Sequence, residues 1–390
     1  MRKLQKVILL YETSRGYSRE IIRGVSRYCY LFEPWLCFSP TPLCADYYKN
    51  PGSLAWVKKI NPDGIIISNG SKDFDKIIKL GIPTIVHRII KNRHPVLPTI
   101  IGDGQSFGRT VAEYFLNKGF RNLAYCGHQD ETPANERGEG FEQTANKAGC
   151  KVHLCIVKGS IIQKSLETEI PILDKWLREL PKPVAVMACN DEVSQNISKT
   201  CMMAGLKVPE EVAICGVAND EFICEFSSPP LSSLLLTNEE AGFEAARLLS
   251  KIMKGEEKPN GQTILVKPKY VVTRQSTDIL AIDDPEVAKA LNFIRESAKK
   301  TIAVEDVVAA TYLSRRGLEK RFRSCLNRTI LQEIRRRKLE EFTRLLLGTN
   351  YSISKIAEIM NTPDISNISR YFKAEKGMTP LDYRKKHGYL

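Results

Sequence analysis

The sequence predicts a two-lobed α/β domain built on doubly wound parallel sheets, followed by an all-α domain with two helix-turn-helix units. From residue 1 to about 275, short apolar runs alternate with amphipathic segments, as expected for repeated βα units. About nine strands are expected there, which is too many for one compact unit and favours two lobes. From Pro285 onward the pattern is helical almost throughout.

The predicted strands are rich in β-branched residues and mostly lack polar–apolar alternation, which is typical of strands covered on both faces of a parallel sheet. In chain order they are Val7–Tyr11, Trp35–Phe38, Gly64–Ser68, Thr84–His87, Thr99–Gly102, Leu123–Cys126, Val152–Val157, Val184–Ala188 and Val212–Val217. Closing strands are expected within Thr263–Ser276. Amphipathic helices are expected over Ser18–Cys29 and around Val111–Leu116, where Lys118-Gly119 marks a stop.

The predicted domain boundaries follow from this pattern. We expect a ligand-sensing domain over residues 1–277, a linker over 278–285 and a helical domain over 286–390. The first lobe should combine roughly 1–120 with 236–260, and the second should combine 121–235 with 261–277. The acidic stretch Asp278–Asp284 marks the boundary before Pro285.

The C-terminal part is basic. Residues 281–390 carry 22 Lys and Arg against 14 Asp and Glu, a net charge of +8, whereas the other 280 residues carry only +5. Basic excess alone usually marks a solvated surface. Here it coincides with a duplicated helical pattern, which points to nucleic acid.

Each helix-turn-helix unit has a short helix, a turn and a longer helix. The first runs through Val304–Ala310, a turn at Thr311–Leu313 and a helix capped by Ser314. The second runs through Ile353–Met360, a turn at Asn361–Pro363 and a helix capped by Asp364. The second helix of such a unit fits the major groove of DNA. A long helix over about 330–347 would span roughly 26 Å and hold the two recognition helices about one DNA turn apart.

Polar side chains on the outer faces of the two recognition helices are the predicted DNA contacts. Those expected to face the major groove are Arg316, Glu319, Lys320, Ser366, Asn367 and Arg370. Those expected at phosphates are Arg315, Arg321, Arg323 and Lys373, and Ser369 lies on the same outer face. The alternative is a helical bundle with a merely basic surface.

This region resembles the AraC/XylS family of DNA-binding domains. The match runs from Ser314-x-x-x-Leu318-x-x-x-Phe322 through Arg337 and Ser352-Ile353-x-x-Ile356-Ala357. It ends with Tyr371-Phe372-Lys373-x-x-x-Gly377-x-Thr379-Pro380-x-x-Tyr383-Arg384. The chain departs from the family at Asn361-Thr362, where a glycine and an aromatic residue are usual, and at Asn367-Ile368, where a Tyr-Phe pair is frequent. Asparagine tolerates the left-handed conformation, so the turn should be retained.

Polar residues follow several predicted strands of the first domain. They are Glu12, Thr13 and Ser14; Asn69; His87 and Arg88; Asp103; Asn190 and Asp191; and Asn219 and Asp220. Ligands of open α/β sheets bind outside the carboxyl ends of the strands. Carboxylates, amides and an arginine suit a ligand with many hydroxyl groups. Taken singly, these residues also suit helix caps and turns, Asp103 and Asp191 in particular.

The first domain resembles the LacI/GalR sensors, which are built like periplasmic sugar-binding proteins. Matching motifs include Asp63-Gly64-Ile65-Ile66, Arg137-x-x-Gly140-Phe141, Ala188-Cys189-Asn190-Asp191 and Pro229-Pro230-Leu231-Ser232-Ser233. Together with the C-terminal DNA-binding domain, they resemble the xylose-operon activators. The resemblance implies an activator that responds to a sugar, xylose or a related pentose.

The same resemblance implies that a ligand closes the two lobes around a set of polar residues. The ligand-binding candidates are Ser14, Asp103, Arg137, Asn190, Asp191, Asn219 and Asp220. The loop after Gly216 has Ala218 where the family usually has an aspartate, so Asn219 or Asp220 would have to substitute, or the ligand differs.

Several function classes find no support in the sequence. The five histidines are scattered, and the 11 cysteines include no C-x-x-C pair, so buried reduced thiols are expected and no metal or other cofactor. No P-loop, G-x-S-x-G elbow or G-x-G-x-x-G after the first strand supports an enzyme, and a sugar-processing enzyme is a remote alternative. A regulator whose sensor binds another ligand or none is the nearer alternative.

We also expect a cytoplasmic protein with no membrane partner. No apolar run approaches the ~18–20 residues that span a bilayer, and the N-terminus reads as a buried strand rather than a signal peptide. The expected partners are double-stranded operator DNA, a sugar effector, RNA polymerase and a second copy of the chain.

Overall fold

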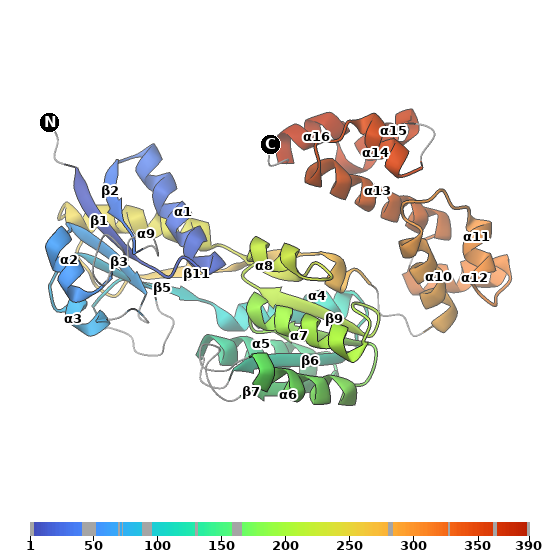
Figure 1. Cartoon of the computed structure of the whole chain (residues 1–390), viewed down its shortest axis with the longest axis horizontal. Coiled ribbons are helices and arrows are strands. Elements are labelled where there is room, and N and C mark those ends of the chain that lie inside the picture. The colour runs from blue at the N-terminus through green and yellow to red at the C-terminus, as the bar shows by residue number, and fades with distance from the viewer. Residues whose placement is uncertain are drawn as a thin grey trace. The chain divides into compact units, whose positions relative to one another are not determined.

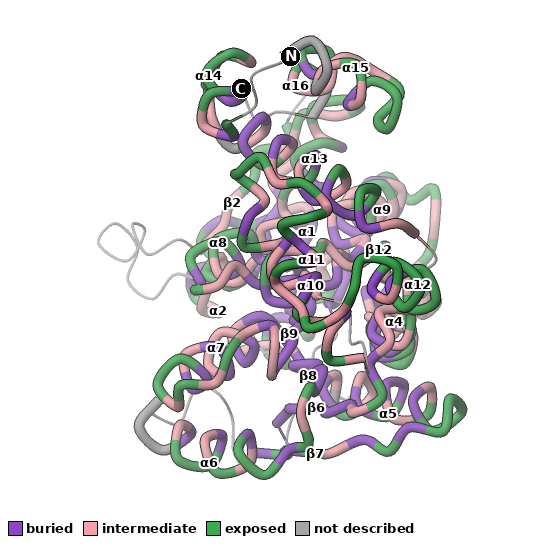
Figure 2. The backbone as a smooth tube through the Cα atoms, turned by 90° about the vertical axis from the view of Figure 1, so that its right-hand side faces the viewer, coloured by how far each residue is buried: buried purple, intermediate pink, exposed green. Residues whose placement is uncertain are grey.

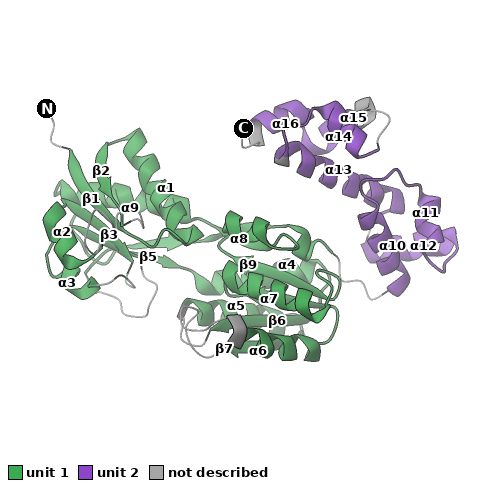
Figure 3. Cartoon of the chain, in the orientation of Figure 1, with its two compact units in different colours: residues 1–280 green, residues 281–390 purple. Residues whose placement is uncertain are grey.

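The computed structural model describes residues 4–40, 52–68, 71, 73–87, 96–128, 132–157, 166–279, 284–326, 328–361 and 365–387. The chain forms two compact units, Met1–Leu280 and Ala281–Leu390 (Figure 3). The predicted pair of domains is therefore present.

The first unit contains two six-stranded sheets (Figure 1). The first sheet has the order β11-β5-β4-β3-β1-β2, and all its neighbouring strands are parallel. Its strands are β1 (Gln5–Leu10), β2 (Trp35–Phe38), β3 (Gly64–Ser68), β4 (Thr84–His87), β5 (Thr99–Gly102) and β11 (Thr263–Val266).

The second sheet has the order β12-β10-β9-β8-β6-β7 and is parallel except for the antiparallel edge strand β12. Its strands are β6 (Asn122–His128), β7 (Val152–Val157), β8 (Val184–Ala188), β9 (Val212–Val217), β10 (Ser232–Leu236) and β12 (Pro268–Val272). The central strands β6, β8 and β9 are buried along most of their length (Figure 2). This burial explains why their sequences lack alternation.

Helices accompany each sheet. The first lobe holds α1 (Gly16–Leu31), α2 (Leu54–Ile60), α3 (Phe74–Ile78) and α9 (Asn238–Met253), and the second holds α4 (Gly104–Asn117), α5 (Thr132–Lys147), α6 (Leu166–Glu179), α7 (Asp191–Ala204) and α8 (Glu221–Phe226). Helices α2 and α3 pack on the first sheet through an apolar cluster around Ile8, Ile65 and Trp56. A short 3₁₀ helix, η2 (Gln275–Thr277), ends the unit.

The chain passes between the two sheets three times, after β5, after β10 and between β11 and β12. Two predicted lobe boundaries therefore differ from the structure. The first crossing follows β5, before residue 104 rather than near 120, and the third lies between β11 and β12, after residue 266 rather than near 260. Helix α4 packs against α5 of the second lobe, and β11 pairs with β5 of the first lobe. Apolar periodicity identifies a helix or strand but not the neighbour against which it packs, so it could not place these crossings.

All nine predicted strands are present, and the closing strands expected within 263–276 are β11 and β12. Strand β10 was not predicted; it begins with Ser232 and Ser233, and serine is a residue type common in turns. Both side chains are buried and paired: the Ser232 hydroxyl contacts Thr277 Oγ1 at 2.6 Å, and Ser233 Oγ donates to Asp191 at 2.5 Å.

Helices α4 and α5 cross closely because of two glycines. A Cβ atom on Gly108 would collide with the backbone carbonyl of Arg137, and one on Gly140 would collide with the backbone of Gln105. The close approach lays the first turns of α5, with Arg137, against Phe107 of α4.

A buried carboxylate holds the loop after β9. Asp191, at the start of α7, is 3% exposed, and its Oδ2 accepts the backbone N–H of Asp220 at 2.7 Å. The Ser233 hydroxyl that donates to Asp191 also accepts the backbone N–H of Asn219 at 3.0 Å. These bonds fix a loop in which Ala218 and Asn219 have φ of 100° and 50°. Such conformations persist in non-glycine residues only where the surroundings enforce them.

The second unit is entirely helical. Its helices are α10 (Pro285–Glu296), α11 (Val304–Ala309), α12 (Arg315–Leu326), α13 (Ile330–Gly348), α14 (Ile353–Ile359), α15 (Ile365–Lys376) and α16 (Pro380–His387). One apolar cluster joins α10, α11 and α12 to the start of α13, and another joins the end of α13 to α14, α15 and α16. The two predicted helix-turn-helix units, α11–α12 and α14–α15, are thus carried by one long helix.

The turns of these units agree with the sequence. Ser314 Oγ accepts the backbone N–H of Gly317 at 3.3 Å, as expected of a cap. Asn361 has a φ of 47°, the left-handed conformation predicted for it. The cap predicted at Asp364 lies outside the described residues.

We predict that Asp191→Asn removes part of the pH dependence of stability. Burial raises the pKa of Asp191 to about 7, from an ordinary value of 3.8. Between these pH values the folded chain binds a proton that the unfolded chain releases. The free energy of unfolding should therefore fall as pH rises, by up to about 1.4 kcal/mol per pH unit. Asparagine stays neutral, so its chain should lack this slope.

Chemical denaturation of both chains between pH 5 and pH 8 measures the difference. Asp174→Asn, at a half-buried site on α6 where Asp174 pairs with Arg178, is the control and should keep the wild-type slope. An unchanged slope in Asp191→Asn would show that Asp191 is ionised throughout this range.

Candidate functional site

A cavity of about 160 Å³ lies between the two lobes of the first unit. It is lined from both lobes, and its polar lining includes Tyr17, His87, Arg137, Asn190, Glu192 and Asp220. Most of these residues follow strands of the two sheets or begin the next helix, as expected for the carboxyl ends of parallel strands. The volume suits a small molecule rather than a polymer.

Four of the predicted ligand residues line the cavity: Arg137, Asn190, Asp191 and Asp220. Arg137 Nη1 donates to the carbonyl of Cys189, and its guanidinium lies 5.6 Å from the ring centroid of Phe107. Arg137 is thus held in place at the wall of the cavity.

Asn190 has two roles in the structure. Its Oδ1 accepts the backbone N–H of Val193 at 2.8 Å and caps α7, and the residue also lines the cavity. Asn190 can therefore cap a helix and line the cavity at the same time. Asp191 has both carboxylate oxygens engaged by Ser233 and Asp220, so it shapes the loop beside the cavity.

Three other predicted ligand residues do not line the cavity and form other hydrogen bonds. Ser14 is exposed and donates to Glu12 at 2.8 Å. Asp103 caps α4 by accepting the backbone N–H of Ser106 at 3.0 Å, and it is not among the lining residues although its neighbours Gly102 and Gly104 are. Asn219 is buried, and its Oδ1 accepts from Arg274 Nη1 at 2.8 Å. Short polar side chains after strands serve as caps as readily as ligand groups.

Six polar lining residues were not among the predicted ligand residues: Arg15, Tyr17, His87, Glu136, Glu192 and Asn238. His87 had the appropriate signal, a polar residue directly after a strand. Glu192 lies beside the predicted pair Asn190-Asp191. Tyr17 and Asn238 lie in the first turns of α1 and α9, and only the packing of the lobes brings them to the cavity.

An ion pair joins the two lobes at this cavity. Arg19 Nη2 lies 2.8 Å from each carboxylate oxygen of Asp220, while Arg19 Nη1 donates to the carbonyls of Thr13 and Ser14 at 2.9 and 2.6 Å. The Asp220 side chain is only 7% exposed. Asp220 therefore connects α1 of the first lobe to the loop after β9 of the second.

His87 is an uncharged group in the wall. It lies between the rings of Tyr11 and Tyr17, with ring centroids 5.7 and 5.6 Å away. Burial lowers the pKa of His87 to about 4, so the imidazole is neutral near pH 7. Its buried Nδ1 has no hydrogen-bond partner among the residues that the structure describes.

The second unit presents a basic face on α12. Leu318 and Phe322 are buried, while Arg315, Arg316, Glu319, Lys320 and Arg323 are exposed. Arg315 pairs with Glu305 and with Glu319, the latter at 3.2 Å. Within the described ranges, no hydrogen bond or ion pair engages Arg316, Lys320 or Arg323, so these cations are available for an anionic partner.

On α15 the described candidates also face outward. Arg370 and Lys373 are exposed, Ser369 is half-buried and Phe372 is buried. The side chains of Ser366, Asn367 and Ile368 lie outside the described residues.

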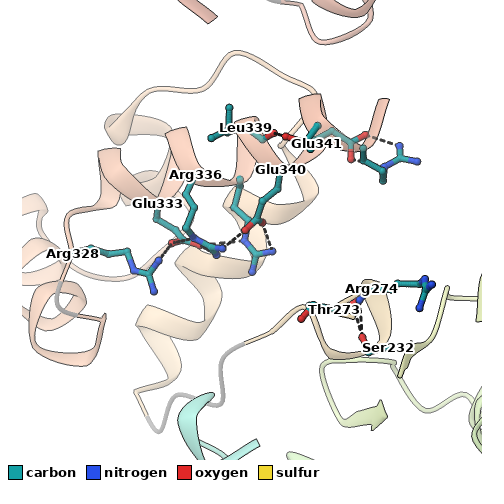
Figure 4. A network of polar contacts seen from close by, with 12 residues as sticks. Ser232, Thr273, Arg274, Arg328, Glu333, Arg336, Leu339, Glu340 and Glu341 are labelled. Atoms are coloured by element: carbon teal, nitrogen blue, oxygen red, sulfur yellow. Dashed lines mark hydrogen bonds and ion pairs between the residues drawn. The ribbon is translucent and has the colours of Figure 1, made fainter. Parts of the chain in front are cut away.

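A buried ion network stiffens the start of α13 (Figure 4). Glu333 has a fully buried side chain and accepts from Arg336 at 2.6 and 2.9 Å and from Arg337 at 3.1 Å, with Arg328 at 3.2 Å. Although burial raises the pKa of Glu333, the hydrogen bond and the charges of these arginines outweigh it and hold the pKa below its usual value. The three arginines are therefore structural and are not candidates for DNA contact.

Comparisons with known proteins agree with this division. Residues 112–277 match the model of the periplasmic binding protein-like domain, and residues 307–386 match a helix-turn-helix domain. The xylose operon regulatory protein of Haemophilus influenzae is 29% identical, with 97% of this chain and 98% of the relative covered. That of Escherichia coli is 27% identical, with 98% and 97% covered.

Solved structures show the same architecture. A structure of the xylose-binding transcription activator XylR matches with a TM-score of 0.73 at 26% identity and covers 99% of both chains. A LacI family regulator from Enterococcus faecium, solved with bound ribose, matches 71% of this chain with a TM-score of 0.55 at 20% identity and supports the fold of the first unit.

No described helix has the length and apolar character needed to cross a bilayer. The relatives that match over the full length are operon regulatory proteins, and the C-terminal part matches a helix-turn-helix domain. The chain is therefore a DNA-binding transcription regulator with an AraC/XylS-type helix-turn-helix domain behind a periplasmic-binding-protein-like domain, and it resembles the xylose operon regulators over its whole length.

Proposed function

We propose that the chain is a sequence-specific transcription activator controlled by a small sugar, xylose or a related pentose, that binds between the two lobes. The observation that supports this is the cavity, whose polar lining comes from both lobes and includes His87, Arg137 and Asn190. Its full-length relatives are named as xylose operon regulatory proteins.

A ligand other than xylose is the second candidate, and Ala218 favours it. Ala218 lines the cavity at the position where an aspartate is usual in related sensors, and its methyl group accepts no hydrogen bond. Asp220 does not replace that acceptor freely, because Arg19 occupies both of its oxygens. A sugar-processing enzyme is a remote third reading that no described group favours.

The ligand would act by stabilising the closed arrangement of the lobes. A ligand shifts this equilibrium only by its different affinity for the open and closed states. The loop after β9 is the proposed relay, since Asn219 accepts from Arg274, and Arg274 lies next to η2 at the end of the unit. Arg274 also has its backbone N–H bound by Ser232 at 2.7 Å (Figure 4).

In the helix-turn-helix domain, two sets of residues are proposed to contact DNA. Those facing base edges are Arg316, Glu319, Lys320, Ser366, Asn367 and Arg370. Those nearer the phosphates are Arg315, Arg321, Arg323, Ser369 and Lys373. Arginine suits guanine, and Glu319 can accept from the cytosine amine. The pairing of Arg315 with Glu305 and Glu319 gives it a positioning role as well. RNA polymerase as a partner and a cytoplasmic location belong to the same proposal.

We predict that Arg137→Ala loses the ligand response and keeps DNA binding. Removing a charged hydrogen-bond donor should weaken sugar binding by about 1.5–3 kcal/mol, roughly 10- to 100-fold. Calorimetric titration with D-xylose and other pentoses, alongside binding of operator DNA, measures both properties.

Arg121→Ala, at an exposed site between α4 and β6, is the matched control and should behave as wild type. If Arg137→Ala keeps its melting temperature and still responds fully to the sugar, the cavity is not the ligand site. If the wild-type chain responds to no sugar, the proposed control by sugar fails.

We predict that Arg316→Ala weakens specific DNA binding by about 1–3 kcal/mol and relaxes the preference at one base pair. Arg344→Ala removes the same charge from α13, where Arg344 is paired with Glu341, and controls for general electrostatic loss. Fluorescence anisotropy with operator and scrambled duplexes compares the two. Equal losses in both variants, on both duplexes, would contradict base reading by Arg316.

We also expect two copies on DNA, because helix-turn-helix regulators commonly bind tandem or two-fold sites. Multi-angle light scattering of the chain with operator DNA should show a mass of two chains per duplex, and the chain alone is measured for comparison. A single chain in both samples would overturn the homodimer.

A further inference from the structure

The three chain crossings between the lobes continue into three segments that lie together in the second lobe. The crossing after β5 leads into α4, the second crossing directly follows β10, and the crossing after β11 leads into β12. Strands β10 and β12 pair with each other, and α4 packs against β12. A change in the angle between the lobes therefore acts on α4, β10 and β12 together.

At the crossings, these three segments are joined by hydrogen bonds beside the cavity. The N–H of Asp103, just before α4, donates to the carbonyl of Val266 at 3.1 Å. The N–H of Thr237, just after β10, donates to the carbonyl of Lys267 at 3.0 Å, and the Lys267 N–H donates to Thr237 Oγ1 at 2.8 Å. Val266 and Phe107, the latter near the start of α4, line the cavity. This end of the three segments is thus in contact with whatever occupies the cavity.

At their other ends, the same segments are joined by side-chain hydroxyl groups. Tyr114 of α4 has its Oη 2.6 Å from Thr277 Oγ1 and 2.9 Å from Thr273 Oγ1. Thr273 follows β12, and Thr277 ends η2. Thr277 Oγ1 also lies 2.6 Å from Oγ of Ser232, the first residue of β10, and both of these side chains are fully buried. One chain of hydroxyls therefore links α4, β10 and the residues after β12.

The hydrogen atoms of this hydroxyl chain all point one way. Ser232 Oγ donates to the carbonyl of Arg274 at 3.0 Å, so its single hydrogen is not available to Thr277 (Figure 4). Thr277 therefore donates to Ser232, and Tyr114 donates to Thr277. Burial raises the pKa of Tyr114, so the phenol keeps its proton. Hydrogen bonds in such a chain strengthen one another, and removal of one hydroxyl interrupts it.

Thr277 lies where the hydroxyl chain reaches the end of the first unit. It is the last residue of η2, and the unit itself ends at Leu280. The Thr277 N–H donates to the carbonyl of Arg274 at 3.3 Å, and its own carbonyl accepts the N–H of Ile279 at 2.8 Å. Because its hydroxyl, N–H and carbonyl are all bound, Thr277 sets the direction in which the chain leaves the first unit.

We propose that Tyr114 is a positioning residue for ligand control, which holds Thr277 against β10 and so transmits movement of the crossings to the segment leading to the helix-turn-helix domain. The inference rests on the proposed function and adds a route for the signal. A ligand that changes the angle between the lobes moves the cavity end of α4, and the hydroxyl chain makes the end of η2 follow. This route is distinct from the loop after β9, which reaches η2 through Arg274.

The test uses the full chain, a DNA duplex that the wild-type chain selects from a random library, and D-xylose, D-ribose and L-arabinose. Isothermal titration gives the sugar affinity of the free chain, and fluorescence anisotropy gives the factor by which the most effective sugar changes DNA affinity. Coupling between two sites commonly corresponds to a factor of about 5 to 150. In Tyr114→Phe this factor should fall close to unity. Its sugar affinity should stay at the wild-type value, because Tyr114 does not line the cavity.

Variants at Thr277 separate the hydroxyl from the rest of the side chain. Thr277→Val removes the hydroxyl at nearly constant volume and should lose the response, whereas Thr277→Ser keeps the hydroxyl and should retain it. The double variant Tyr114→Phe/Thr277→Val should lose no more than either single variant, because both break one contact. Tyr270→Phe, at an exposed site on β12, removes a tyrosine hydroxyl elsewhere and is the matched control.

A full response of DNA affinity to sugar in Tyr114→Phe would overturn the inference and leave the proposed function standing. A parallel loss of melting temperature, sugar affinity and response in Tyr114→Phe and Thr277→Val would give the hydroxyls a structural role alone and overturn it too. A wild-type chain that binds none of the three sugars, or binds one without a change in DNA affinity, would overturn the proposed sugar control together with this inference.

Discussion

The ion pair of Arg19 Nη2 with both carboxylate oxygens of Asp220 is the contact on which the arrangement of the first unit depends. It spans the two lobes, with Asp220 almost fully buried and Arg19 40% exposed in its side chain. A buried carboxylate without this partner would be strongly unfavourable. The pair therefore couples the distance between the lobes to the position of the loop after β9, which also forms part of the cavity wall.

That loop is held from the other side by Asp191 and Arg274. Asp191 accepts from Ser233 and from the backbone of Asp220, and Arg274 donates to Asn219. The loop has little freedom of its own, so a change at the cavity has few ways to relax locally. Arg274 lies two residues before Ser276, whose hydroxyl donates to Ile214 of β9 at 2.6 Å. The cavity loop, the central strand and the end of the unit thus share one set of polar contacts.

The helical unit uses buried charge differently. Glu333 forms ion pairs with Arg328, Arg336 and Arg337 at the start of α13. These cations therefore stabilise the helix that carries both helix-turn-helix units. The exposed cations Arg316, Lys320 and Arg323, which have no ion pair among the described residues, lie on α12 instead. A stiff carrier with free charge on the recognition helices suits a reader whose geometry must not vary between DNA sites.

The sequence by itself determined the elements of this protein. Uninterrupted apolar runs located every strand except β10, duplicated apolar periodicity located the two helix-turn-helix units, and a tolerant asparagine predicted the left-handed turn at Asn361. Arg137 and Asn190 were also found, because a motif and a position after a strand marked them. Only the tertiary structure decided which lobe holds α4 and β11, and which polar residues reach the cavity. Asp103 and Asn219 are short polar residues at strand ends like Asn190, yet neither lines the cavity: Asp103 only caps α4, and Asn219 binds Arg274. Side-chain direction depends on partners that are distant in sequence, and a one-dimensional pattern carries no information about them.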